Sequence, residues 1–240
     1  MEPPATISEP RRMVTTRRSI QAGPVRRTGL NKTNGRAITF AVSLPIATSK
    51  GAATRELIVE RAFGIARRNG LEGLSIGELA NAVGMSKSGV FAHFGSREDL
   101  QLSVLEWTAG RFTEIVVRPA LARPRGLQRL RAIVSGWFDW VLMHEEGCVI
   151  LAAAGEYDGR PGLMRDRIVG WLGQWNAQLV KAVSHCIESG ELAADTDPGL
   201  MAFELAALAD GLHNTRLHDP ARAEEMARRS FERLIRSYSP

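Results

Sequence analysis

The sequence of 240 residues predicts an all-α fold, in which a small head with a helix-turn-helix precedes a larger helical domain. From residue 54 onward, apolar residues recur at intervals of three and four, the spacing that places them on one face of a helix. A serine followed three positions later by an acidic residue occurs at Ser75 and at Ser96, and this pattern is typical of a helix N-terminus. No stretch shows a convincing alternation of the kind that predicts a strand.

Three segments of the chain differ in composition. Residues 1–50 contain nine Lys or Arg, only two acidic residues and no helical period, so we expect a basic disordered tail that binds polyanions without sequence preference. An alternative is that translation starts later, for example at Met13. Residues 51–100 are predicted to form the head, and residues 101–240 the second helical domain.

Cysteine content and hydropathy indicate the compartment. Cys148 and Cys186 are too few for a disulfide framework, which favours a reducing environment. Residues 38–47 are apolar and follow basic residues as in a signal peptide, but they begin far from the N-terminus and include Pro45. No apolar run approaches the roughly 18 residues of a membrane span. The sequence therefore predicts a cytoplasmic protein with no membrane partner.

The first two helices of the head have clear boundary signals. Thr54 is a candidate N-cap for the first, and Asn69-Gly70 a candidate stop. The second opens with a capping box from Ser75 to Glu78. Gly84 follows this helix, where a tight turn requires positive φ. The apolar face of the first helix is predicted to consist of Val59, Ala62, Phe63 and Ala66.

A third helix is predicted from Ser86 to Phe94 and presents small polar groups at its start. A helix N-terminus attracts phosphate because free N–H groups and the macrodipole point toward it. Arg97, which opens the next helix after Gly95, could hold a neighbouring phosphate. The polar residues of this N-terminus are Ser86, Lys87, Ser88 and Gly89.

Residues 71–80 (LEGLSIGELA) and 83–100 (VGMSKSGVFAHFGSREDL) resemble the DNA-binding signature of TetR/AcrR-family transcriptional regulators. The resemblance extends over residues 54–105 without a gap. It implies a three-helix DNA-binding head and a C-terminal helical domain for ligand binding and dimerisation. It also implies a homodimer on pseudo-palindromic double-stranded operator DNA, acting as a repressor that an unknown small-molecule effector releases.

Carried over by position, the resemblance also implies which residues touch DNA. The family commonly has tyrosine where this chain has Phe91 and His93; Phe91 cannot donate a hydroxyl, whereas His93 can donate a ring N–H. Ser88 and Gly89 would lie near base edges. The expected phosphate contacts are Ser75, Ser86, Lys87 and Arg97.

Beyond residue 100 the pattern predicts helices only, with a break between Pro119 and Pro124 and a loop over residues 155–161. An apolar pocket with few polar groups is the usual form of a small-molecule site. The polar residues Asp139, His144, Glu156, Tyr157 and His213 would each need a partner if buried. The later helices are predicted over residues 100–117, 126–143, 148–154, 162–189, 198–217 and 221–237. The candidate pocket residues are Trp137, Trp140, His144, Cys148, Leu151, Trp171, Trp175, Phe203 and His213. The alternative for residues at helical spacing is that most of them are core or dimer contacts.

Other classes of function receive less support. An enzyme is disfavoured because the sequence contains no nucleophile elbow, phosphate loop, paired metal motif or convincing acid/base pair, and no cofactor is expected. His144 and Cys148 are spaced as metal ligands could be, but Gly147 interrupts their helix, so no metal site is predicted. A helical ligand-binding or interaction protein whose head has lost DNA binding remains the alternative.

Overall fold

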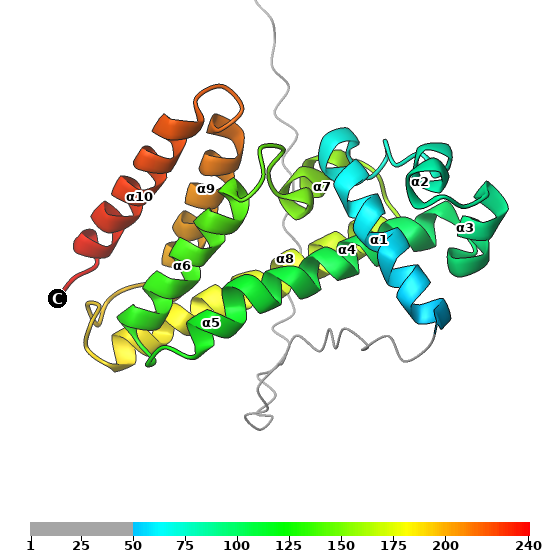
Figure 1. Ribbon diagram of the computed structural model, residues 1–240. Coiled ribbons are helices and arrows are strands. Elements are labelled where there is room, and N and C mark those ends of the chain that lie inside the picture. The colour runs from blue at the N-terminus through cyan, green and yellow to red at the C-terminus, as the bar shows by residue number, and fades with distance from the viewer. Residues whose placement is uncertain (1–49) are drawn as a thin grey trace, which may run out of the picture. The chain divides into compact units, whose positions relative to one another are not determined.

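Helices make up all the regular secondary structure in residues 50–240, the part of the chain that the computed structural model describes (Figure 1). This confirms the predicted all-α class. The expected basic tail and the alternative start at Met13 lie outside the described residues. The elements are α1 Lys50–Asn69, α2 Ile76–Val83, α3 Lys87–Phe94, α4 Arg97–Phe112, a π-helical segment Thr113–Val117, α5 Arg118–Leu121, α6 Leu127–Leu142, α7 Val149–Tyr157, α8 Leu163–Glu188, α9 Pro198–Thr215 and α10 Pro220–Ser237.

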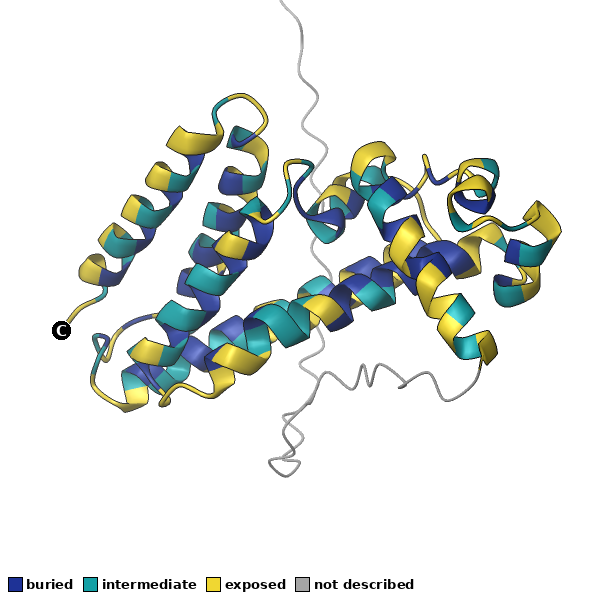
Figure 2. Ribbon diagram, viewed as in Figure 1, coloured by how far each residue is buried: buried dark blue, intermediate teal, exposed yellow. Residues whose placement is uncertain are grey.

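Two apolar clusters organise these helices (Figure 2). The first joins α1–α4 and continues into α7 and the first half of α8, with Leu79 and Leu100 fully buried and Tyr157 at its edge. The second joins α6, α8, α9 and α10 around Phe138. Because α7 and α8 contribute to the first cluster, the head packs directly against the second domain.

The caps predicted at Ser75 and Ser96 are confirmed, and Ser86 caps α3 in the same way. The Ser75 hydroxyl accepts a hydrogen bond from the Glu78 N–H at 3.4 Å, and the Ser86 hydroxyl accepts one from the Gly89 N–H at 3.0 Å. The capping box at Ser75 is only half formed, because the Glu78 carboxylate lies 3.5 Å from the guanidinium of Arg68. Gly84 has φ +67°, as the predicted turn requires.

Three predicted helix boundaries were wrong. Helix α1 begins at Lys50, and the Thr54 hydroxyl donates to the Lys50 carbonyl at 2.9 Å from inside the helix instead of capping it. The helix that was expected to break at Pro119 continues to Leu121, because a π-helical segment precedes the proline. Helix α7 extends to Tyr157, so the following loop is shorter than expected.

None of the helices in the described part of the chain is long and apolar enough to cross a membrane.

Replacing Gly84 with valine is expected to lower the free energy of unfolding by about 1–2 kcal/mol, because a left-handed backbone is costly for a residue with a Cβ. The cost is conformational, since an added Cβ at Gly84 would meet no atom within 4 Å. Gly64→Ala is the matched control: that site is equally open but lies inside α1, where alanine favours the helix. Thermal unfolding measures both changes. Equal stability of Gly84→Val and the parent would contradict the turn assignment.

Candidate nucleic-acid interface and effector cavity

Helix α3 exposes the polar edge that the sequence predicted. Ser86, Lys87 and Ser88 are exposed at its N-terminus, and the hydroxyl oxygens of Ser86 and Ser88 lie 3.1 Å apart. Val90 and Phe94 point the opposite way, into the first apolar cluster. The helix is therefore anchored by one face while its first turn remains accessible.

Lys87 lies beside the start of α2. A Cβ placed on Gly77 would come within 3.5 Å of the Lys87 ammonium nitrogen and 3.7 Å of the Ser75 hydroxyl oxygen. The ammonium group thus shares a surface with the N-terminus of α2, where partial positive charge accumulates. The positive charge of Lys87 and the partial positive charge at the N-terminus of α2 therefore lie on the same part of the surface.

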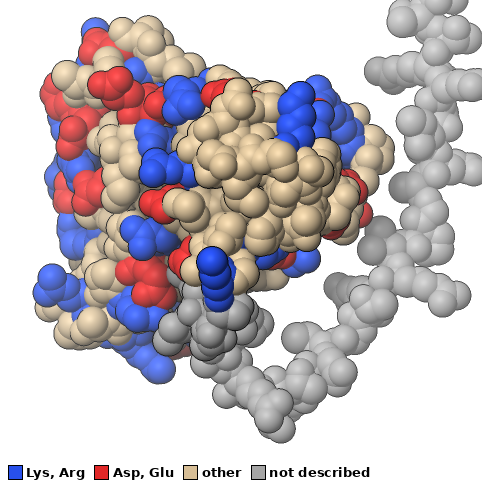
Figure 3. Space-filling model, turned by 45° about the vertical axis from the view of Figure 1, so that its right-hand side comes forward, with Lys and Arg blue, Asp and Glu red and all other residues tan. Residues whose placement is uncertain are grey.

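The remaining residues of α3 differ in accessibility. Phe91 is 40% exposed, whereas His93 is only partly exposed and its ring centroid lies 6.4 Å from that of Phe94. A Cβ on Gly89 would lie 3.2 Å from the Ser86 hydroxyl oxygen and 3.3 Å from the methyl carbon of Met85. Position 89 therefore has little room for a side chain. Figure 3 shows mostly uncharged surface on the side brought forward, with separate Lys and Arg side chains around it.

Arg97 is exposed, but it already has partners within the protein. Its guanidinium donates to the backbone carbonyl of Glu72, and one terminal nitrogen lies 3.7 Å from the Glu72 carboxylate. A phosphate contact by Arg97 would have to share or replace these interactions. The sequence did not indicate this pairing, because the two residues are separated by the whole of α2 and α3.

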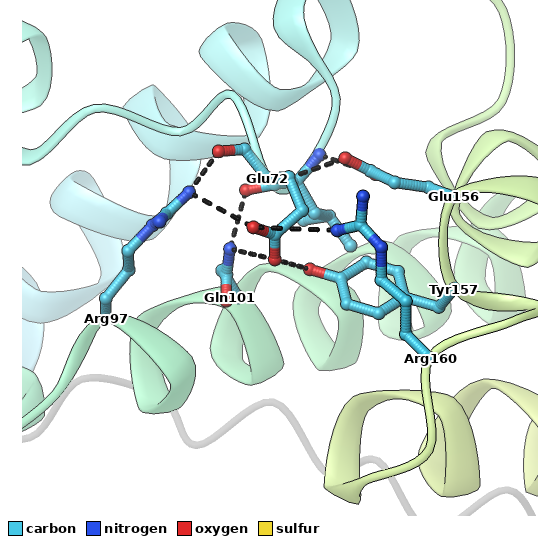
Figure 4. A network of polar contacts seen from close by, with 7 residues as sticks. Glu72, Arg97, Gln101, Glu156, Tyr157 and Arg160 are labelled. Atoms are coloured by element: carbon cyan, nitrogen blue, oxygen red, sulfur yellow. Dashed lines mark hydrogen bonds and ion pairs between the residues drawn. The ribbon is translucent and has the colours of Figure 1, made fainter.

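Glu72 is the centre of a polar network between the head and α7 (Figure 4). The Tyr157 hydroxyl donates to its carboxylate at 2.5 Å, and the Arg160 guanidinium lies 3.7 Å from the other carboxylate oxygen. Gln101 also approaches, at 3.4 Å. The hydrogen bond from Tyr157, with Arg97 nearby, lowers the pKa of Glu72 despite the opposing effect of burial. Glu72 is therefore held as a carboxylate at neutral pH.

Glu156, at the end of α7, binds backbone N–H groups of the loop between α1 and α2 through its side-chain carboxylate. Its carboxylate oxygens accept hydrogen bonds from the N–H groups of Leu71 at 3.0 Å and Glu72 at 2.8 Å. Sequence reasoning singled out Glu156 and Tyr157 only as polar residues in need of partners. The structure gives both of them partners in the head, and we call the contacts of Glu156 and Tyr157 with residues 71–72 the head clamp.

A cavity of about 60 Å³ lies between α4, α6, α7 and α8. Five of the expected pocket residues line it: Trp137, Cys148, Leu151, Trp171 and Trp175. Ile150, in the apolar stretch from Cys148 to Ala153 that the sequence also offered as pocket-lining, lies in the wall as well. The sequence analysis missed four others: Ala109, Phe112, Thr113 and Leu172. Ala109, Phe112 and Thr113 lie within the helix that the sequence predicted over residues 100–117. The apolar spacing of that helix could not separate cavity residues from core residues.

Four expected pocket residues lie outside this cavity. Trp140 is buried behind its wall and donates to the Cys148 sulfur at 3.4 Å. His144 packs against the ring of Phe63 with centroids 6.1 Å apart. Phe203 is 66% exposed on the outer face of α9, and His213 is partly buried on the same helix. Helical spacing alone could not tell which face of α9 turns inward.

Neither cysteine has the setting of a reactive thiol. Cys148 and Cys186 are free and buried, and burial raises the pKa of Cys148 and raises that of Cys186 to about 12. A thiol that stays protonated is a poor nucleophile and a poor metal ligand. Among residues 50–240, no group of three or more His, Cys, Asp or Glu side chains is placed to hold a metal ion.

A helix anchored by one face with an accessible polar N-terminus, at the head of an all-helical body that encloses an apolar cavity, is the architecture of a helix-turn-helix regulatory protein. Comparison with known families agrees with this class. Residues 52–104 match the model of bacterial regulatory proteins of the tetR family, and residues 126–231 match the tetracyclin repressor-like C-terminal domain. The chain belongs to the TetR family, whose members are transcriptional regulators and not enzymes.

A curated relative is the HTH-type transcriptional repressor NicS of Pseudomonas putida, 31% identical over 108 residues. The alignment covers 44% of this chain and half of the length of that repressor. Among solved structures, a TetR regulator from Chloroflexus aurantiacus is 24% identical with TM-score 0.70, covering 78% of this chain and 94% of its own. The structure of AibR in complex with isovaleryl coenzyme A and operator DNA is 22% identical with TM-score 0.63, covering 78% and 98%. At these identities the structural likeness supports the fold.

Proposed function

We propose that this chain is a homodimeric repressor that binds operator DNA through α2 and α3 and releases it when a small molecule occupies the cavity. The observation that carries the proposal is the accessible first turn of α3, held out by the buried Val90 and Phe94. A helix presented in this way fits the major groove of B-form DNA. In this arrangement Ser88 and Gly89 lie near base edges, while Ser75, Ser86 and Lys87 contact phosphates.

Lys87→Ala is expected to weaken binding to all DNA sequences and to lower the slope of log affinity against log salt by about one unit per half-site. The physical reason is that the ammonium group beside Gly77 releases one counterion when it meets a phosphate. Lys181→Ala is the control, because that lysine is exposed on α8, outside the helix-turn-helix. Fluorescence anisotropy over a salt series measures the slope. An unchanged slope for Lys87→Ala would remove Lys87 from the phosphate contacts.

We propose that α9 and α10 form the dimer contact. Their outer faces carry apolar side chains that are at least half exposed: Leu200, Phe203 and Met226. A groove between the two helices is lined by Phe203, Leu208 and Leu234 together with polar residues. Exposed apolar surface of this kind commonly marks a protein–protein interface. A two-fold dimer would bring two such faces together and set the spacing of the two heads.

The head clamp provides a route from the cavity to the DNA-binding surface. The first turn of α7 contributes Ile150 and Leu151 to the cavity wall, while its last turn carries Glu156 and Tyr157. A ligand that displaces the first turn of α7 therefore strains the contacts at its other end. We propose that this strain repositions the two heads and lowers operator affinity.

An alternative is a ligand-binding protein whose head does not bind DNA, which the exposed Phe91 and the internal partners of Arg97 favour. Selection of bound duplexes from a random pool by the purified protein distinguishes the two. The proposal predicts enrichment of a two-fold symmetric sequence. A bound pool that stays random would favour the alternative.

A further inference from the structure

The chemistry of the cavity wall restricts what the cavity can hold. Among the described residues that line it, none carries a formal charge. The Thr113 hydroxyl donates to the carbonyl oxygen of Ala109 at 2.9 Å, and burial keeps the Cys148 thiol protonated by raising its pKa. An ionised ligand would lose its hydration here without gaining a counter-charge, so the wall selects against charge.

The cation behind this wall does not change that conclusion. Arg216 is close enough to Cys148 to act on its thiol electrostatically, but its guanidinium lies against Gly147 and is not part of the cavity lining. Its terminal nitrogens donate to the backbone carbonyls of Glu145, at 2.5 Å, and Glu146. The two terminal nitrogens therefore already have acceptors in the protein, and the buried Nε, which has none among the described residues, belongs to a side chain outside the cavity lining.

Aromatic rings form much of the wall and stand at right angles to one another. The ring of Trp175 lies 4.9 Å from that of Phe112 and 5.2 Å from that of Trp137, with interplanar angles of 85° and 86°. Rings arranged edge to face present both edges and faces to a guest, which suits another flat ring.

One polar group at the cavity has no partner in the protein. The indole nitrogen of Trp175 is buried and, among the described residues, has no hydrogen-bond acceptor. It is the only atom of the described cavity residues in this condition. A buried donor without an acceptor is costly, so a bound molecule that supplies an acceptor gains from pairing with it.

We infer that the cavity takes an uncharged, aromatic, largely apolar molecule that presents one hydrogen-bond acceptor to the indole N–H of Trp175. The inference rests on the proposed function only in calling that molecule the effector. The present volume of about 60 Å³ is smaller than the apolar cavity of roughly 150 Å³ that admits benzene in another protein, so a ring enters only by moving part of the wall. The first turn of α7 is the part of the wall connected to the head clamp.

Three probes with the same heavy-atom skeleton test the chemistry on the full-length protein alone, by titration calorimetry. They are isopropylbenzene, acetophenone and benzoate, which respectively lack an acceptor, add a neutral acceptor and add a charge. Acetophenone is expected to bind about fivefold to tenfold more tightly than isopropylbenzene, the effect of one hydrogen bond. Benzoate is expected to bind most weakly.

Trp175→Phe separates the hydrogen bond from ring packing, and Trp171→Phe is the matched control in the same wall. Trp175→Phe should abolish the preference for acetophenone over isopropylbenzene, whereas Trp171→Phe should preserve it. Circular dichroism confirms that each variant is folded, and the order of the three probes on the parent protein stands without the variants.

Tighter binding of benzoate than of acetophenone, an unchanged preference in folded Trp175→Phe, or no binding of any probe would overturn the inference. These titrations contain no DNA, so they can fail or succeed independently of operator binding. Failure of the random-duplex selection with success here would leave an aromatic-binding cavity in a protein that is not a repressor.

Discussion

Glu156→Gln is expected to speed hydrogen exchange at the backbone amides of Leu71 and Glu72 by about tenfold to a hundredfold, the range that corresponds to losing hydrogen bonds to a charged acceptor. Both amides donate to the Glu156 carboxylate, at 3.0 and 2.8 Å. Glutamine has nearly the same shape but only one acceptor oxygen, and its NH₂ group would face one of the two donors. Hydrogen exchange followed by mass spectrometry or NMR measures the change.

With acetophenone as the cavity ligand, the proposed function expects a loss of operator affinity, and Glu156→Gln should make that loss smaller because the clamp is the proposed route from the cavity to the head. Glu145→Gln is the matched control: Glu145 is exposed in the loop before α7, and its carboxylate has no hydrogen-bond or ion-pair partner among the described residues. If the two amides exchange at the parent rate in Glu156→Gln, the clamp does not hold the head.

Phe203→Asp is expected to raise the dissociation constant of the dimer about a hundredfold or more, because a two-fold interface loses the burial of two phenyl rings at once. It also places two unpaired carboxylates where apolar surface was buried. Phe203 is 66% exposed in the single chain, so the substitution leaves the apolar core of each subunit intact. Sedimentation velocity over a range of concentrations measures the change, and operator affinity should fall with it because one head alone binds half a site.

Leu163→Asp controls for adding a charge to an exposed apolar position. Leu163 is 51% exposed at the first residue of α8, away from the outer faces of α9 and α10. It should leave the dimer unchanged. A Phe203→Asp protein that sediments as the parent does would place the dimer contact elsewhere.

The local features of the head were predictable because each depends on a few neighbouring residues. Ser75 and Ser86 act as caps through hydrogen bonds to N–H groups three positions later. Gly84 adopts a positive φ because the tight turn after α2 requires one, and glycine does so without steric cost. Thr54 shows the limit of such signals. Its hydroxyl could have capped a helix, but it lies within α1 and donates to the Lys50 carbonyl.

The long-range features could not be read from the sequence. The hydrogen bond between Glu72 and Tyr157 joins positions 85 residues apart, and nothing near either residue indicates the other. Phe203 was expected in the pocket because α9 has apolar residues on several faces, and only the packing of α8 and α10 against α9 decides which face is covered. For this reason local chemistry predicted the caps and the turn of the head better than it predicted which residues line the cavity.

Methylation protection of guanine N7 on the selected operator tests the placement of α3 most directly, because N7 lies in the major groove. The account predicts protection in two successive major grooves about one helical turn apart on one face of the duplex, with protection lost for Lys87→Ala at matched free protein. Bound operator in which every guanine N7 stays as reactive as in free DNA would contradict it.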